Sequence, residues 1–218
     1  MVVENWNKIS LDGVKGILWD LDNTIYIYES VHKIAYQETR KTALGFDISE
    51  SQFDAFWKKS RDIVHNQLHG QGASHSRLLY LQKLHEFAKG FTSSEFGLKL
   101  EEVYWSTFLN SMKVREGALE LMNNARLNGI EMAIVTDLTA QIQLRKLEKL
   151  SLNQYVRYMV SSEEAGVEKP EPAIFQLALD KLNLKPSEVI MIGDSYEKDI
   201  KGAESIGIKA YQIDDNTI

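Results

Sequence analysis

The 218-residue sequence contains 44% hydrophobic residues, enough for one substantial core or for a core that carries a smaller inserted domain. It has no cysteine, which excludes disulfides, thiolate zinc ligands and a cysteine nucleophile, so a bound metal would need oxygen or imidazole ligands. The formal net charge is -6 without a basic cluster, which argues against duplex nucleic acid and anionic membranes as main partners. Residues 1–11 lack the apolar segment of a signal peptide, and no run reaches the ~18 apolar residues that indicate a membrane span, so we expect a cytoplasmic protein.

The first predicted element is a buried strand over residues 16–19, an apolar run that ends directly at acidic residues. Residues 29–112 then show no convincing buried strand, and their apolar residues follow helical spacing throughout. A glycine-rich break at residues 69–74 divides this stretch into two halves. We therefore expect a helical insert after the first strand.

Amphipathic helices and short strands alternate in the rest of the chain. Apolar residues at helical spacing predict three helices, over residues 118–125, 140–150 and 174–182. The apolar stripe that we expect to face the core in the second of these consists of Ala140, Leu144, Leu147 and Leu150. Apolar runs predict four further strands, at residues 132–135, 158–160, 189–192 and 210–213. Because strands that alternate with helices form parallel sheets, the sequence predicts an α/β core.

Reactive side chains follow four of the predicted strands. Ligands of an open parallel sheet bind beyond the carboxyl ends of its strands, so these positions are where chemistry is expected. In chain order, the four segments are Asp20-Leu21-Asp22-Asn23-Thr24, Thr136-Asp137, Lys169-Pro170 in a longer loop, and Gly193-Asp194-Ser195-Tyr196-Glu197-Lys198-Asp199.

These segments supply the groups that phosphoryl transfer requires. Transfer from an unactivated ester needs an in-line nucleophile, an acid for the leaving oxygen, and cations that offset charge on the phosphoryl oxygens. Asp20 and Asp194 offer hard oxygen ligands that suit Mg²⁺. Lys169 adds positive charge, and Thr136 adds a hydroxyl donor near a helix start, where anions are favoured. Each segment alone also fits a turn, a helix cap or a solvated loop, but their joint occurrence in one order favours a site.

In this order, Asp-x-Asp-x-Thr, Thr, Lys-Pro and Gly-Asp-x-x-x-x-Asp resemble the four signature motifs of the haloacid dehalogenase superfamily, over nearly the whole chain. The resemblance implies a Rossmann-like parallel sheet core with helices on both faces, formed by residues 1–28 and 113–218. It also implies an inserted all-helical cap domain, residues 29–112, that closes over the site and selects the substrate. Two departures are Trp19, where phenylalanine is common, and Asp137, where asparagine is common. Neither removes a catalytic group, and we expect the side chain of Asp137 to point away from the phosphate, for example as a cap of the following helix.

The resemblance also implies roles for the acidic motif residues. Asp20 would attack phosphorus and form an aspartyl-phosphate, while Asp22 would protonate the leaving group and later activate water. Mg²⁺ would be held by the Asp20 carboxylate, the Asp22 backbone carbonyl and Asp194.

Further residues would bind the phosphoryl group or support the site. By the same resemblance, Thr136 and Lys169 would bind the transferring phosphoryl group, and Asp199 would support the metal or Lys169. In the helical insert, His75 and Arg77 follow the glycine-rich break directly and are the best candidates for substrate contact.

The expected function is hydrolysis of a phosphomonoester, with a small sugar phosphate, a nucleotide monophosphate or a related metabolite as substrate. The core is similar to that of the nucleotidase and sialic-acid-phosphate phosphatase branch. A dehalogenase is disfavoured because displacement of halide from carbon needs no leaving-group acid, so Asp22 would be superfluous. The alternatives are a phosphomutase, which shares all four motifs, and a catalytically silent regulatory or binding module on the same fold. Loss of a motif carboxylate would have favoured the silent module, but none is lost. The sequence leaves the oligomeric state open.

Overall fold

The computed structural model describes residues 2–3 and 5–214. The chain forms two compact units, Met1–Tyr28 with Lys113–Ile218, and Glu29–Met112. We call the first the core unit and the second the helical unit. Within the described residues, no helix is both long and apolar enough to cross a membrane.

The core unit contains a six-stranded sheet in which every neighbouring pair of strands is parallel. Its strand order is β1-β6-β5-β2-β3-β4. The strands are β1 (Val2–Val3), β2 (Gly16–Trp19), β3 (Glu131–Thr136), β4 (Tyr158–Ser161), β5 (Val189–Gly193) and β6 (Lys209–Ile213). This confirms the predicted α/β class and the five predicted strands. Only β1 was not predicted, because two residues are too short to show a periodic pattern.

Strand β2 lies between β3 and β5, and all four of its residues are buried. Trp19, its last residue, stands opposite Ile134 of β3 and Ile192 of β5. A strand buried on both faces has an uninterrupted apolar sequence, which is why this one was easy to identify. The register places the residues that follow β2, β3 and β5 beside one another at the carboxyl edge of the sheet.

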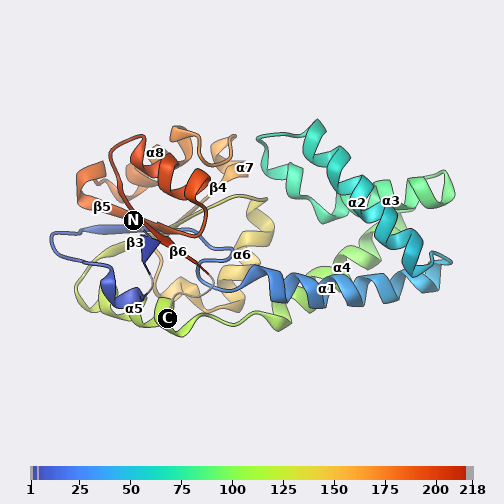
Figure 1. The fold of residues 1–218 in the computed structure, drawn as a ribbon, viewed down its shortest axis with the longest axis horizontal. Coiled ribbons are helices and arrows are strands. Elements are labelled where there is room, and N and C mark those ends of the chain that lie inside the picture. Colours follow the sequence, from blue (N-terminus) through green and yellow to red (C-terminus); the bar gives the residue numbers. More distant parts are fainter. Residues whose placement is uncertain (1, 4, 215–218) are drawn as a thin grey trace. The chain divides into compact units, whose positions relative to one another are not determined.

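Helices cover both faces of this sheet, with α8 on one side and α5 on the other (Figure 1). The helix α8 packs against β3 and β4 through Ile174, Phe175 and Ala178, which are fully buried. The α-helices of the core unit are α5 (Glu116–Leu127), α6 (Ala140–Lys149), α7 (Ser162–Ala165), α8 (Pro172–Leu182) and α9 (Lys201–Glu204). The shorter turns are the 3-10 helices η1 (Trp6–Lys8), η4 (Leu152–Gln154) and η5 (Pro186–Glu188) and the π-helical turn η6 (Tyr196–Ile200).

The predicted inward face of α6 is right at Leu147, which is buried, and wrong at Leu144. Leu144, expected in the core, has 54% of its surface exposed. The residues of α6 that are buried are Ile142, Gln143, Lys146 and Leu147. A helix does not bury a lysine and a glutamine unless they have polar partners, and these partners belong to the candidate site described below.

The helical unit contains no strand among the residues that the structure describes there. Its elements are α1 (Tyr28–Ala43), η2 (Leu44–Phe46), α2 (Glu50–Gln67), η3 (Gly72–His75), α3 (Arg77–Lys89) and α4 (Ser94–Ser111) (Figure 1). Ser49 begins α2 with a capping box that it shares with Gln52. Gly90 ends α3 in the left-handed region, at φ 83°. The interior of this unit is aromatic, with Phe53, Trp57 and Tyr104 in contact.

Candidate active site

Asp20 comes directly after β2 and is held there by both backbone and side chain. Its N–H donates to the carbonyl of Ile192 at 2.9 Å, which continues the parallel ladder one residue beyond the strand. The carboxylate is 7% exposed, accepts a hydrogen bond from the Thr24 hydroxyl at 3.0 Å, and forms an ion pair with Lys169 at 2.5 Å. The chain therefore presents one rigid, nearly buried carboxylate at the centre of the sheet edge.

Lys169 lies between two carboxylates. Its Nζ is 2.5 Å from Asp20 Oδ1 and 2.6 Å from Asp199 Oδ1, and the residue is 4% exposed. Although burial alone lowers the pKa of a lysine, the charges of Asp199, Asp20 and Asp137 outweigh it and raise the pKa of Lys169 well above its usual value. The ammonium group is therefore charged at any physiological pH.

Asp137 does not cap the helix α6, contrary to the expectation from the sequence. The first N–H of α6, that of Ala140, donates instead to Oε2 of Glu163. One carboxylate oxygen of Asp137 accepts the backbone N–H of Lys169 at 3.0 Å, and the other pairs with Lys198 at 2.8 Å. Asp137 thus fixes the loop that carries Lys169, and its charge is balanced by Lys198.

The segment after β5 brings Asp194 and Asp199 to the same place. Asp199 is 1% exposed, and its Oδ2 accepts the N–H of Ser195 at 2.9 Å. A Cβ atom added to Gly193 would lie 2.4 Å from Cγ of Asp199, so only glycine lets this carboxylate pack against the end of the strand.

Three carboxylates in this region fit a hard divalent cation. One oxygen each of Asp20, Asp194 and Asp199 lies within 4.8 Å of the other two. Burial raises the pKa of Asp194 to about 6, and the charge of Asp199 adds to this effect. Burial also raises the pKa of Asp20 well above its usual value, although Lys169 opposes the shift. These carboxylates repel one another although Lys169 lies among them, and a divalent cation with oxygen ligands would relieve that repulsion.

Asp22 lies two residues beyond Asp20 but has different surroundings. Its side chain is 30% exposed, and Nζ of Lys146 lies 2.6 and 3.0 Å from its two oxygens. The Tyr26 hydroxyl donates to Oδ1, and Gln143 lies 3.3 Å from Oδ2. Burial acts to raise the pKa of Asp22, but the charge of Lys146 and the hydrogen bonds from Lys146, Tyr26 and Gln143 hold it below its usual value.

Thr136 is the last residue of β3 and is 1% exposed. Its Oγ1 lies 2.6 Å from Nε2 of Gln143. Since the same Gln143 amide reaches Asp22, one side chain links the residue after β2 with the end of β3.

The structure thus brings six of the eight predicted site residues to one edge of the sheet. Asp20, Lys169 and Asp199 are in direct contact, and Asp194 lies within reach of a shared cation. The other two are Asp22 and Thr136, which are joined through Gln143.

His75 and Arg77, the remaining two, belong to the helical unit. Arg77 is 8% exposed, donates to the carbonyl of His75 at 2.6 Å, and places its guanidinium 5.5 Å from the ring centres of Tyr104 and Trp105. His75 is half-buried. Arg77 therefore contributes to the interior of the helical unit itself.

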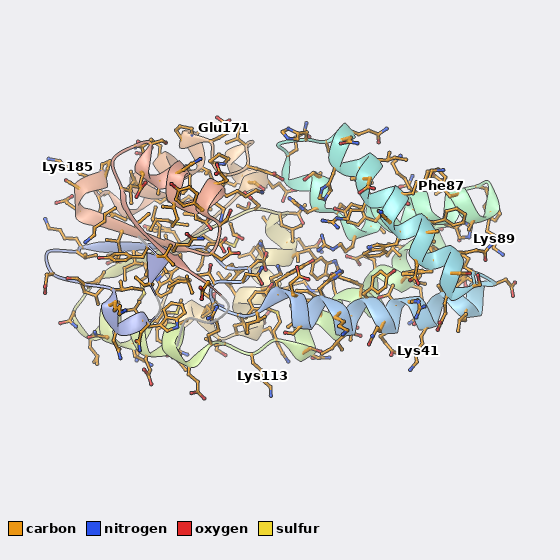
Figure 2. The ribbon with its side chains drawn as sticks, viewed as in Figure 1. Lys41, Phe87, Lys89, Lys113, Glu171 and Lys185 are labelled. Atoms are coloured by element: carbon orange, nitrogen blue, oxygen red, sulfur yellow. The ribbon has the colours of Figure 1, made fainter. Side chains whose placement is uncertain are left out.

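Sequence reasoning missed Lys146 and Gln143. The surface lysines Lys113 and Lys185 extend away from the ribbon (Figure 2), whereas Lys146 is fully buried. A signal for these two residues was present: Gln143 and Lys146 are three positions apart, beside Ile142 and Leu147, on the helix that follows Thr136. Polar residues within the apolar face of a helix indicate polar partners inside the fold.

This arrangement has the groups that transfer of a group to a carboxylate requires. It combines a buried carboxylate oxygen, a charged lysine beside it, a set of oxygens for a cation, and a second carboxylate in a separate environment. Such a set supplies a nucleophile, charge stabilisation and an acid–base group.

Comparisons with known proteins agree with this chemistry. A family model described as haloacid dehalogenase-like hydrolase matches residues 14–207. The ribulose-1,5-bisphosphate 5-phosphatase of Halopiger xanaduensis is 37% identical over 200 residues, which cover 91% of this chain and 84% of that protein. The glyceraldehyde 3-phosphate phosphatase of Methanopyrus kandleri is 27% identical over 204 residues, which cover 92% of this chain and 84% of that protein.

Solved structures share the fold. A HAD phosphatase from Thermococcus onnurineus matches with a TM-score of 0.70 and 23% identity, over 92% of this chain and 86% of that one. A 2-haloacid dehalogenase from Pseudomonas syringae matches with a TM-score of 0.71 and 20% identity, over 90% of this chain and 85% of that one. Because proteins with different activities share the fold, these structures support the architecture alone.

Proposed function

This chain belongs to the haloacid dehalogenase-like hydrolase family, and we propose that it is a Mg²⁺-dependent phosphatase that hydrolyses a small sugar phosphate through an aspartyl-phosphate on Asp20. The observation that carries the proposal is the position of the Asp20 carboxylate. It lies at the centre of the sheet edge, in contact with Lys169 and within 4.8 Å of oxygens of Asp194 and Asp199.

In the first half of the reaction, an oxygen of Asp20 attacks phosphorus as the bond between phosphorus and the ester oxygen breaks. Asp22, in its protonated form, gives its proton to the leaving oxygen. Lys169 stabilises the negative charge of the phosphoryl oxygens, and the hydroxyl of Thr136 donates to them.

In the second half, the Asp22 carboxylate takes a proton from water while the water oxygen bonds to phosphorus. The bond between phosphorus and Asp20 breaks, which releases inorganic phosphate and restores the Asp20 carboxylate, and Asp22 is again protonated for the next turnover. The first half leaves Asp22 as a carboxylate, and the ion pair with Lys146 favours that form until Asp22 takes the proton of water.

The carboxylates of Asp20 and Asp194 and the backbone carbonyl of Asp22 would hold Mg²⁺, with Asp199 as a further oxygen nearby. Bound there, Mg²⁺ supplies positive charge that offsets the phosphoryl oxygens and lowers the repulsion between phosphate and Asp20. Asp199 also holds Lys169 in place through the 2.6 Å ion pair.

The substrate class rests on the relatives. The two similar proteins named above are phosphatases of ribulose 1,5-bisphosphate and of glyceraldehyde 3-phosphate, and both match over nine tenths of this chain. We therefore place small sugar phosphates ahead of nucleotide monophosphates as substrates.

The test is a phosphate-release screen with Mg²⁺ present. Ribulose 1,5-bisphosphate, glyceraldehyde 3-phosphate and a set of nucleoside monophosphates would be compared by kcat/KM, with Asp20→Asn as the inactive control. We expect turnover of at least one sugar phosphate by the native protein and none by the variant. If the native protein releases phosphate from none of these esters, or if Asp20→Asn is as active as the native protein, the proposed function is wrong.

We also propose that residues 29–112 form a mobile cap that determines substrate choice while the core unit carries the chemistry. The support is that this segment folds as a compact unit of its own, inserted directly after the segment that contains Asp20 and Asp22.

His75 offers a clearer test of the cap than Arg77. His75 is half-buried, whereas Arg77 is more deeply buried, so its replacement would also disturb the interior of the helical unit. His75→Ala should change the ratio of kcat/KM values between two sugar phosphates and leave hydrolysis of 4-nitrophenyl phosphate mostly intact. The matched control is His69→Ala, because His69 is an exposed histidine in the same glycine-rich break. Equal losses on every substrate would contradict a role in selection.

A further inference from the structure

The helix α6 turns two polar residues inward and an apolar residue outward. Lys146 and Gln143 have no exposed surface, whereas Leu144 is 54% exposed. Burial of a lysine costs several kcal/mol unless a charged partner compensates it. The partner of Lys146 is the carboxylate of Asp22, which lies 124 positions earlier in the chain.

The contacts from α6 fix the Asp22 carboxylate on several sides. Lys146 Nζ lies 2.6 Å from Oδ1 and 3.0 Å from Oδ2, so it bridges both oxygens. Gln143 Nε2 lies 3.3 Å from Oδ2, 2.6 Å from the Thr136 hydroxyl and 2.6 Å from the carbonyl of Asp137. The hydroxyl, carbonyl and carboxylate oxygens can all accept a hydrogen bond, so the nitrogen of the Gln143 amide, which donates, faces these three oxygens.

Asp22 needs such support more than Asp20 does. Asp20 directly follows a buried strand and continues its backbone ladder, whereas Asp22 lies two residues on and its side chain is 30% exposed. A carboxylate at that exposure rotates freely unless it is held, and misplacement of a catalytic group by about 1 Å costs about a hundredfold in rate.

We propose that Lys146 is a positioning residue for proton transfer. It bridges both oxygens of Asp22, and Gln143 links Asp22 to Thr136. Together these contacts fix the position of the acid–base carboxylate relative to the hydroxyl of Thr136 that binds the phosphoryl group. This inference rests on the proposed function. Lys146 itself exchanges no proton and forms no bond to the substrate. It acts only through Asp22.

The effect of Lys146 should therefore depend on the leaving group. Phenyl phosphate and 4-nitrophenyl phosphate have nearly the same shape, but phenolate is the poorer leaving group and needs the proton from Asp22 more. The ratio kcat/KM includes every step through the first irreversible one, which here is departure of the phenol, so it reports leaving-group protonation without hydrolysis of the intermediate.

The experiment compares Lys146→Met, Lys146→Arg and the control Lys149→Met on both esters with Mg²⁺. Lys149 is exposed on the same helix, so its replacement removes the same charge from α6. We expect Lys146→Met to lower kcat/KM for phenyl phosphate by about tenfold or more and to change that for 4-nitrophenyl phosphate much less. Lys146→Arg should recover part of the loss, and Lys149→Met should match the native protein. A uniform loss on both esters would overturn the inference, because that is the result of a merely structural role.

Lys146→Met leaves the carboxylate of Asp22 without its ion-pair partner and could fail to fold for that reason; a double variant removes this risk. Asp22→Asn with Lys146→Met loses both charges together, and thermal unfolding would verify that it folds. If Lys146 acts through Asp22, the double variant and Asp22→Asn alone have equal kcat/KM for phenyl phosphate. A further tenfold loss in the double variant would contradict the inference. Absence of turnover by the native protein on both esters would instead refute the proposed function, and this inference with it.

Discussion

Asp20 and Asp22 are separated by a single residue, yet the structure places their carboxylates in opposite electrostatic surroundings. Burial raises the pKa of Asp20, Lys169 opposes the shift, and the charges of Asp199 and Asp194 add to it. Lys146, Tyr26 and Gln143 together hold the pKa of Asp22 below its usual value against its burial. A cation bound to the Asp20 carboxylate would favour its ionised form, which is the form that attacks phosphorus.

Gly193 gives a test at the level of one residue. A Cβ at this position would lie 2.4 Å from Cγ of Asp199, so Gly193→Ala should displace the Asp199 carboxylate and with it Lys169. We expect kcat to fall by about tenfold or more in phosphate-release assays, because the charged groups move by a fraction of an ångström or more.

The control for this change is Gly45→Ala. Gly45 has nothing within 4 Å of an added Cβ, and its exposed position lies in the helical unit. Unchanged activity in Gly193→Ala, with a folded protein by circular dichroism, would show that the packing of Asp199 against this strand end is unimportant.

The positions of Asp20, Thr136 and Asp194 at the sheet edge could be predicted because each follows an apolar run, and the run alone identifies the strand end. The partners of these residues could not be predicted in the same way. Asp137 was expected to cap α6 and instead binds the backbone of Lys169, 32 positions away. Helix capping is a rule about neighbours in the sequence, so it cannot predict a hydrogen-bond partner that only the fold brings near.

At the level of the element, α6 shows the limit of hydrophobic patterning. Hydrophobic periodicity places apolar residues inside, so Leu144 was expected to be buried and Gln143 and Lys146 were not. Its assumption fails where a helix faces a polar site, because there the buried residues are those that match the site's charges. The helix itself was predicted, and its orientation about its own axis was not.

The helix α1 contains a histidine, His32, that makes the stability of the helical unit depend on pH. Burial lowers the pKa of His32 to about 4, and the charges of Arg77 and Arg61 contribute. Because the folded pKa lies below the unfolded value near 6.5, the unfolded chain binds the proton first as the pH falls. Stability is thus full above about pH 6.5 and is lost progressively between about pH 6.5 and pH 4.

We therefore expect the free energy of unfolding to fall by about 2 kcal/mol more between pH 7 and pH 5 in the native protein than in His32→Gln. Urea unfolding at the two pH values measures this difference. His69→Gln, which changes an exposed histidine, should keep the native pH dependence. If His32→Gln loses as much stability as the native protein between pH 7 and pH 5, His32 does not carry the effect.

For the whole molecule, the acidic cluster predicts that a bound cation governs both activity and stability. A cation that binds only the folded state at a hundredfold excess over its Kd stabilises by about 2.7 kcal/mol, which corresponds to a rise in Tm of about 5–10 °C for a chain of this length. Differential scanning calorimetry with Mg²⁺ and with EDTA measures the shift. EDTA should also abolish phosphatase turnover, and Ca²⁺ should inhibit, because its looser coordination disturbs the in-line geometry.

Asp194→Asn provides the variant for this experiment. Burial and the charge of Asp199 both disfavour the Asp194 carboxylate, and removal of its charge relieves both. The variant without metal should therefore melt above the native protein without metal, yet lose the shift with Mg²⁺. The control Asp62→Asn changes an exposed carboxylate and should behave like the native protein. An undiminished Mg²⁺ shift in Asp194→Asn, or full turnover in excess EDTA, would exclude this cluster as the metal site.

If Asp20 receives the phosphoryl group, rapid mixing of Asp22→Asn with 4-nitrophenyl phosphate and Mg²⁺ should trap the phosphorylated enzyme. Nitrophenolate leaves without an acid, so Asp20 should still be phosphorylated, but hydrolysis of the intermediate lacks its base. We expect a burst of nitrophenol followed by a slow steady rate, and mass spectrometry of the quenched enzyme should find phosphate on the peptide that contains Asp20. No burst and no phosphate on that peptide would contradict transfer of the phosphoryl group to Asp20.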